Sequence, residues 1–188
     1  MEYKTYLYKG FISVERLETI IKGEKRVLER LEIKDAVTAI VTDAEGKIAL
    51  VRQFRPCVDE MLYQTPSGLM DKDGYNVRET LIEELYEECD INSEDIEYCS
   101  QEPIYTYYGV CDCSDSRMSI YRVKLRSIEH SKSVDDTDVD IVEWLTFSEF
   151  EQLARRGEIK DPETLIAYMH LKEEKMLAYF NENMKHEK

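Results

Sequence analysis

The chain has 188 residues, 43% hydrophobic and 35% charged, which suits one folded domain or one domain with a small appendage. Its net charge of −15 argues against a duplex DNA or RNA partner, because binding to a phosphate backbone needs basic patches. No apolar run reaches the length of a membrane span, and the odd count and irregular spacing of the five cysteines favour free thiols in a reducing cytoplasm.

The first 35 residues predict a short N-terminal β segment. Residues 5–20 could supply one or two strands. The segment is rich in large apolar side chains, namely Tyr3, Tyr6, Tyr8, Phe11 and Ile12. An apolar segment outside the main domain would be exposed unless another surface covers it. We therefore expect residues 1–35 to form a dimer contact and residues 36–188 to form the main domain.

The next elements follow from turn and capping signals. Residues 35–55 predict two strands around a turn at Asp43–Gly46, and the prolines and glycines of 64–74 predict a loop. A helix is predicted from about Asn76 to Cys89. Asn76 suits the N-cap, and Glu79 stands three residues later, where it would complete a capping box.

The second half of the chain predicts three more strands and two helices. The strand-like stretches are 103–110, 117–125 and 139–147, and the helical stretches are 148–158 and 162–180. Ser148 is expected to cap the first of these helices and Gly157 to end it, while Pro162 suits the first turn of the second. The order of elements predicts an α+β domain with a mixed sheet.

The helix predicted from Asn76 carries five glutamates: Glu79, Glu83, Glu84, Glu87 and Glu88. Residues three and four apart share a helix face, so Glu84 lies beside Glu87 and Glu88, and each like-charge pair costs about 0.2–0.5 kcal/mol. The charges alone are more typical of a solvated helix face. A hard cation such as Mg²⁺, which prefers carboxylate oxygens, would instead turn the repulsion into binding energy.

The segments around this helix resemble the Nudix hydrolase family, whose box runs G-x5-E-x7-R-E-U-x-E-E-x-G-U, where U is a bulky aliphatic residue. Gly68 begins the box and "EELYEECDI" (83–91) ends it, so that Glu84, Leu85, Glu87, Glu88 and Ile91 fall on family positions. The stretches "LVRQFRP" (50–56), "PSGLMD" (66–71) and "EWLTFSEFEQLARRGEIKDPETLIAY" (143–168) resemble the ADP-ribose pyrophosphatase branch. The resemblance covers most of residues 35–170 and implies an α/β/α sandwich.

The resemblance also implies the site residues. Glu84, Glu87 and Glu88 would bind Mg²⁺ or Mn²⁺, with Glu87 as ligand or base, and Ser67 would offer its backbone carbonyl. The residues expected to contact the substrate are Arg52, Arg55, Gln64, Gly68 and Leu69. Arginine can hold a phosphate through two hydrogen bonds, and we expect both arginines to point to the same side.

Several positions depart from the family pattern. Glu83 stands at the box arginine, Asp90 stands at the late glycine, and the spacing from Gly68 to Glu84 is one residue longer. Branch members carry a glutamate, thought to act on the attacking water, in the loop before the "RMSIYRV" strand. Ser116 holds that position here, and Asp115 or Asp112 beside it could substitute.

Three functions remain open. The first is metal-dependent hydrolysis of the pyrophosphate of a nucleoside diphosphate sugar, with ADP-ribose giving AMP and ribose 5-phosphate. The second is a Nudix-fold protein that binds such a ligand without catalysis, and the third is a structural or partner-binding protein. The resemblance further implies a homodimer in which the partner's N-terminal segment completes the substrate site. The acidic net charge and the lack of a long apolar run predict neither a nucleic-acid nor a membrane partner.

Overall fold

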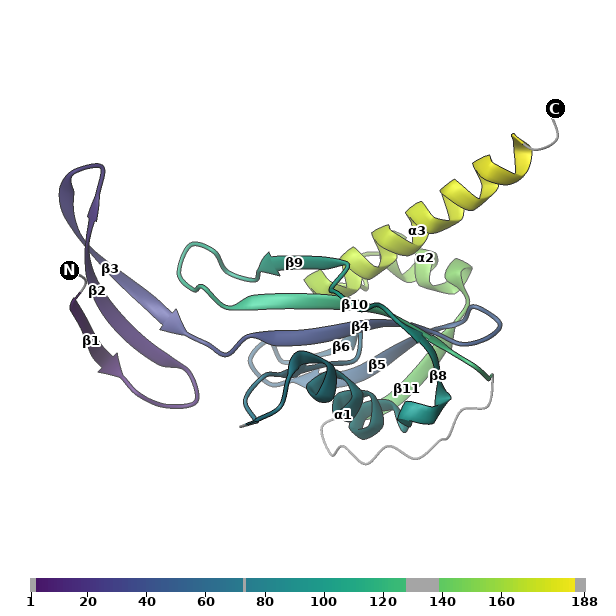
Figure 1. The fold of residues 1–188 in the computed structure, drawn as a ribbon, viewed down its shortest axis with the longest axis horizontal. Helices are drawn as coiled ribbons and strands as arrows, with labels where there is room; N and C mark the ends of the chain where they lie inside the picture. Colours follow the sequence, from purple (N-terminus) through teal and green to yellow (C-terminus); the bar gives the residue numbers. More distant parts are fainter. Residues whose placement is uncertain (1–2, 73, 128–138, 185–188) are drawn as a thin grey trace.

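The computed structural model describes residues 3–72, 74–127 and 139–184. A three-stranded antiparallel sheet, ordered β1-β2-β3, stands beside an eight-stranded mixed sheet whose main path runs β11-β5-β4-β10-β8 (Figure 1). The elements in chain order are β1 (Tyr3–Tyr8), β2 (Ser13–Ile21), β3 (Glu24–Glu32), β4 (Ala36–Thr42), β5 (Ile48–Arg55), β6 (Glu60–Gln64), β7 (Ser67–Leu69), α1 (Val77–Cys89), the 3-10 helix η1 (Ser93–Asp95), β8 (Ile96–Cys99), β9 (Tyr105–Tyr108), β10 (Arg117–Leu125), β11 (Val139–Leu145), α2 (Phe147–Arg155) and α3 (Pro162–Asn183).

The large sheet is covered on both faces, which explains why every residue of β4 is buried. Val37, Ala39 and Val41 pack with the α1 residues Leu81 and Leu85 in one core cluster. A second cluster on the other face joins Ile40, Ile48 and Leu50 to residues of α2 and α3. Because β4 pairs parallel with β10 and antiparallel with β5 and β7, the sheet is mixed. The α+β class and the α/β/α sandwich are confirmed.

Helix α1 begins and ends as its local sequence dictates. The Asn76 side chain accepts hydrogen bonds from the backbone N–H groups of Arg78 and Glu79, and the Glu79 carboxylate accepts from the Asn76 N–H, so the predicted capping box is present. The helix ends at Asp90, which adopts a left-handed conformation with φ 55. Glycine is most common in that conformation, and aspartate tolerates it better than most residues. Asp90 thus fills a backbone role that glycine would also fill.

Some boundaries differ from the sequence-based expectations. The N-cap of helix α2 lies two residues earlier than expected, because Thr146, and not Ser148, accepts the hydrogen bond from the Glu149 N–H. The predicted loop 64–74 contains strand β7, which pairs with the start of β4. Residues 5–20 contribute to two strands, β1 and β2, as expected, and a third strand, β3, follows them that the sequence did not predict. Strands β3 and β7 were missed because pairing with a neighbouring strand, which local propensity does not encode, decides such strands.

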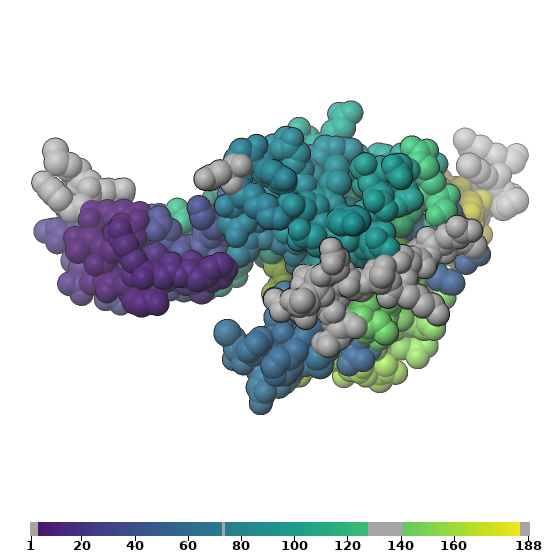
Figure 2. Space-filling view, turned by 90° about the horizontal axis from the view of Figure 1, so that it is seen from below, coloured from purple at the N-terminus to yellow at the C-terminus, as the bar shows by residue number. Residues whose placement is uncertain are grey.

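The small N-terminal sheet projects from one end of the large sheet (Figures 1 and 2). The chain passes between the two sheets across residues 33–35, between β3 and β4. The loop before β10 provides a second connection, since the Leu31 N–H donates to the Cys113 carbonyl at 2.7 Å and Leu31 forms an isolated parallel bridge with Ser114. At the other end, α3 extends beyond the sheet (Figure 1). No helix in the described part of the chain is long and apolar enough to cross a membrane.

Candidate functional site

Strand β7 and helix α1 meet where the sequence predicted the site. Gly68 pairs with Val37, and Leu69 pairs with Ala36, so both lie on the backbone ladder beside β4. A Cβ atom added to Gly68 would lie 2.0 Å from Cδ of Glu84. Such a distance is impossible for real atoms, and glycine is the residue that lets a side chain approach the backbone this closely. The Glu84 carboxyl group therefore lies directly against β7.

Glu88 lies one helical turn further along on the same side of α1. Its side chain is buried, and its Oε2 accepts a hydrogen bond of 2.8 Å from the backbone N–H of Ser67. Glu84 and Glu88 thus contact successive residues of β7. Their spacing of four residues is what places both carboxylates on one helix face.

Glu83 and Glu87 lie in a different direction. Lys72, in the loop between β7 and α1, places its Nζ 2.7 Å from Oε2 of Glu83 and 3.6 Å from Oε1 of Glu87. Glu83 and then Glu87 raise the pKa of Lys72 above its usual value, so this ammonium stays charged at neutral pH. The glutamates of α1 therefore divide into a pair directed at β7 (Glu84 and Glu88) and a pair directed at Lys72 (Glu83 and Glu87).

This arrangement suits a cation that takes few protein ligands. Across the described residues there is no group of three or more His, Cys, Asp or Glu side chains placed to hold a metal ion together. Mg²⁺ needs fewer, since it usually keeps several waters and is bound through one or two carboxylates plus substrate phosphates. The cradle that Gly68 leaves for the Glu84 carboxyl, with Glu88 beside it, offers such a pair.

The two candidate substrate arginines have different surroundings. The Arg52 guanidinium lies 5.1 Å from the ring centroid of Tyr63 and 3.7 Å from Glu143, whereas Arg55 Nε donates a hydrogen bond of 2.6 Å to Gln64 Oε1. The expectation that both arginines point to the same side is wrong. Residues three apart on a strand face opposite sides of the sheet, because side chains alternate with a period of two.

Gln64 belongs to a buried polar chain that the sequence analysis did not predict. Its Nε2 donates a hydrogen bond of 2.8 Å to Asp161, and Asp161 caps α3 by accepting from the Thr164 N–H. Next to this cap, the Tyr107 hydroxyl donates to Glu163. Burial, followed by the charge of Asp161, raises the pKa of Glu163. The feature of the sequence that pointed to these contacts is the pair Asp161–Pro162 at the start of the last helix.

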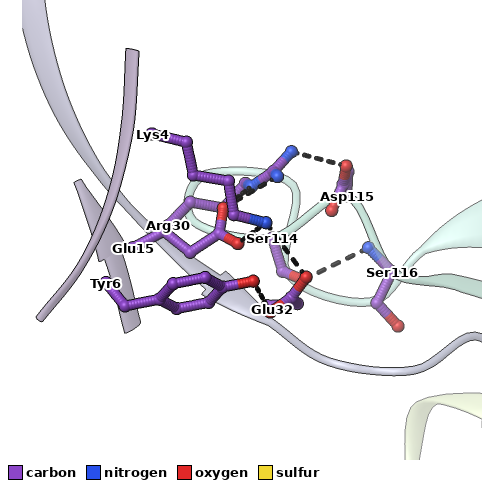
Figure 3. Close-up of polar contacts among 8 residues, drawn as sticks. All are labelled: Lys4, Tyr6, Glu15, Arg30, Glu32, Ser114, Asp115 and Ser116. Atoms are coloured by element: carbon purple, nitrogen blue, oxygen red, sulfur yellow. Dashed lines mark hydrogen bonds and ion pairs between the residues drawn. The ribbon is translucent and has the colours of Figure 1, made fainter. Parts of the chain in front are cut away.

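Asp115, the candidate base, contacts the N-terminal sheet (Figure 3). Arg30 Nη1 lies 2.7 Å from Asp115 Oδ2, and Arg30 Nη2 lies 2.9 Å from Oε2 of Glu15. The neighbouring Ser116 hydroxyl donates to the Lys34 carbonyl at 2.9 Å. The loop that carries Asp115 is therefore fastened to β3 and to the linker that follows it.

Glu15 lies at the centre of the ion pairs that hold Arg30 in place. Its side chain is inaccessible to solvent and forms ion pairs with Lys4 and Arg30 (Figure 3). Desolvation acts to raise the pKa of Glu15, but hydrogen bonds from Lys4 and Arg30 outweigh it, and the pKa lies below its usual value.

Comparison with known proteins gives a matching family model and several similar proteins. The family model described as NUDIX domain matches residues 32–168. The chain is 28% identical over 159 residues to a methanol dehydrogenase activator of Bacillus methanolicus, covering 84% of this chain and 82% of that protein. It is 26% identical to an ADP-ribose pyrophosphatase of Bacillus subtilis, covering 81% and 80% of the two chains. It is 29% identical to a GDP-mannose pyrophosphatase of Salmonella arizonae, again covering 81% and 80%.

Proposed function

Because the protein belongs to the Nudix domain family, we propose that it hydrolyses the pyrophosphate of a nucleoside diphosphate sugar, with ADP-ribose as substrate and AMP and ribose 5-phosphate as products. Nudix hydrolases act on small nucleotide derivatives and generally use divalent metal ions. Two of the relatives are named pyrophosphatases of nucleotide sugars, which supports this substrate class.

The observation that carries the proposal is the placement of Glu84 and Glu88 against β7. We propose that these two carboxylates hold Mg²⁺ or Mn²⁺, with the Ser67 carbonyl as a further ligand, whereas Glu87, also expected from the sequence as ligand or base, faces Lys72 instead. A cation bound there would neutralise the pyrophosphate and make an attacking water more acidic. The backbone at Gly68 fixes where the Glu84 carboxylate lies, so the site needs little rearrangement to accept a cation.

The remaining residues are proposed to position the substrate. Arg55 would bind a phosphate, and Gln64, itself held by Asp161, would fix the direction of the Arg55 side chain. Arg52 lies on the opposite face of β5 and would contact another part of the substrate, while Gly68 and Leu69 would contact it through their backbone. Asp115 is proposed to accept the proton of the attacking water, and its ion pair with Arg30 would place the loop that carries it.

The test is direct turnover. Purified protein is incubated with ADP-ribose, GDP-mannose or ADP-glucose and Mg²⁺ or Mn²⁺, and nucleoside monophosphate is quantified by liquid chromatography. We expect metal-dependent release of AMP from ADP-ribose. Glu84→Gln and Glu88→Gln should each lose more than about tenfold in rate, the loss typical even of groups one step removed from a metal. Glu97→Gln, an exposed carboxylate on β8, serves as the control.

A second candidate function has specific support. One relative is named an activator of methanol dehydrogenase, and Glu83 occupies the box position where an arginine is expected. This favours a protein that binds a nucleotide sugar or a partner protein without turnover. Binding of ADP-ribose in calorimetry, combined with no hydrolysis of any tested nucleotide sugar, would replace the first proposal with the second.

We also propose a homodimer located in a reducing cytoplasm. The cysteines of the described chain are free thiols, as expected for such a compartment. The N-terminal sheet supplies the proposed dimer contact.

A further inference from the structure

Lys72 connects the loop after β7 to the outer side of α1. Its Nζ lies 2.7 Å from Glu83 and 3.6 Å from Glu87, so one ammonium bridges two carboxylates that stand four residues apart on the helix. The loop that contains Lys72 follows directly from Gly68 and Leu69. One short segment therefore contacts both glutamate pairs of α1, through the β7 backbone on one side and through Lys72 on the other.

Glu83 depends on this contact. Its Oε2 is buried and accepts no directed hydrogen bond within the described chain, so the approach of Lys72 is an ion pair that supplies the compensating charge. A buried carboxylate oxygen that loses a charge partner is costly, and the side chain would move to reach water. Glu87 lies on the same face of α1, one turn further along, so the Glu83 side chain would move on the face that carries Glu87.

The four glutamates lie within about one and a half turns of the helix, which makes their directions interdependent. Glu83 and Glu87 form one row along α1, and Glu84 and Glu88 form the adjacent row, because residues four apart align. Like charges in adjacent rows repel each other. The inner row is held by the β7 backbone at Ser67 and Gly68, whereas the outer row is held by Lys72.

We propose that Lys72 is a positioning residue, which holds Glu83 and Glu87 in the outer row and so keeps Glu84 and Glu88 directed at β7 for a divalent cation. This inference rests on the proposed function, because it takes Glu84 and Glu88 as the metal ligands. It also assigns a role to Glu83: the residue completes an ion pair whose cation comes from the preceding loop instead of from the helix.

The sign of the effect on metal binding follows from charge balance. Lys72 alone would repel a second cation. At 2.7 Å from Glu83, however, the two charges nearly cancel, and their combined field falls off quickly with distance. Loss of Lys72 therefore exposes the negative charge of Glu83, which adds attraction for the metal, but it also releases two carboxylates beside the ligands, and we expect this loss of positioning to be the larger effect. Partners that orient metal ligands typically change metal affinity by about tenfold to a hundredfold when they are removed.

The experiment measures Mn²⁺ affinity directly, by electron paramagnetic resonance of free Mn²⁺, in the full-length protein. Lys72→Met keeps the length of the side chain and removes the charge, and we expect its affinity for Mn²⁺ to fall about tenfold. Lys72→Arg restores the charge and should stay within about threefold of wild type. Lys72→Met/Glu83→Gln removes both members of the pair and should recover most of the lost affinity. Lys172→Met is the matched control, since Lys172 is similarly exposed and lies 3.8 Å from Glu151.

Thermal unfolding in EDTA accompanies each titration, so that loss of stability is separated from loss of affinity. If Lys72→Met unfolds at a lower temperature than wild type but binds Mn²⁺ with the same affinity, the positioning role is overturned. Tighter Mn²⁺ binding by Lys72→Met would overturn it as well. Wild-type protein that binds no Mn²⁺ would overturn the proposed metal site itself. The two failures are distinguishable, because the first leaves wild-type binding intact and the second does not.

Discussion

At Gly68, the backbone of β7 and the carboxyl group of Glu84 occupy the space that a Cβ atom would need. We predict that Gly68→Ala displaces the Glu84 carboxylate and weakens Mn²⁺ binding and hydrolysis by more than about tenfold, because a shift of about 1 Å at a catalytic group can cost on the order of a hundredfold. Gly109→Ala is the control, since an added Cβ there meets no atom within 4 Å. Equal Mn²⁺ affinity in wild type and Gly68→Ala, measured by titration, would contradict the proposed site.

Glu15 gives a prediction with a definite pH dependence. A carboxyl group whose pKa is lowered in the folded state stabilises it above the unfolded pKa, here 4.5, and this stability is lost as the pH falls through the folded pKa. We predict that Glu15→Gln destabilises the N-terminal sheet at pH 7, because Lys4 and Arg30 lose their shared partner. The difference from wild type should shrink as the pH falls below 4.5.

Hydrogen exchange of the amides in β1 to β3, measured at several pH values, tests this prediction. Glu18→Gln is the matched control, because Glu18 pairs with Lys25 on the same sheet but is only partly buried. A Glu15→Gln effect that stays constant from pH 7 to pH 3 would show that the ion pairs do not carry the stability.

Helix α1 begins at a cap that its local sequence determines, whereas its proposed metal ligands lie further along the helix. Asn76 caps the helix, whereas Glu84 and Glu88 lie two and three turns later. We predict that Asn76→Ala lowers the free energy of unfolding by about 1 kcal/mol, the usual cost of a lost N-cap. Mn²⁺ affinity should change less than about threefold, because capping effects fall off within the first turn. Thermal unfolding and the Mn²⁺ titration, with Asn183→Ala as a control at the end of α3, provide the measurement.

Considered as a whole, the molecule exposes apolar side chains at its N-terminal end. Tyr8, Phe11 and Ile20 are 61%, 83% and 71% exposed. We predict a homodimer through this sheet, so that sedimentation velocity at micromolar concentration should report twice the chain mass of 22.2 kDa.

Two variants locate the dimer interface. Phe11→Ser should shift the equilibrium toward monomer, whereas Met176→Ser, on the exposed part of α3, should not. A wild-type particle of 22.2 kDa alone would contradict the dimer, and an effect of Met176→Ser without an effect of Phe11→Ser would move the interface to α3.

The sequence by itself determined the features that depend on neighbours along the chain. The capping box of Asn76 and Glu79, the strand pair around Asp43–Gly46, and Pro162 in the first turn of α3 all appear in the structure. The carboxylate row of α1 also followed from helical spacing. These interactions join residues within a few positions of each other, so a local pattern contains the information needed to predict them.

Only the tertiary structure decided which of those carboxylates face β7 and which face Lys72, and it paired β7 with β4. It also placed Asp115 against Arg30, 85 residues away, and Gln64 against Asp161, 97 residues away. Contacts between such distant residues depend on how the sheets and helices pack together. No local pattern specifies that packing, and this is why helix α1 was predictable while the partners of its glutamates were not.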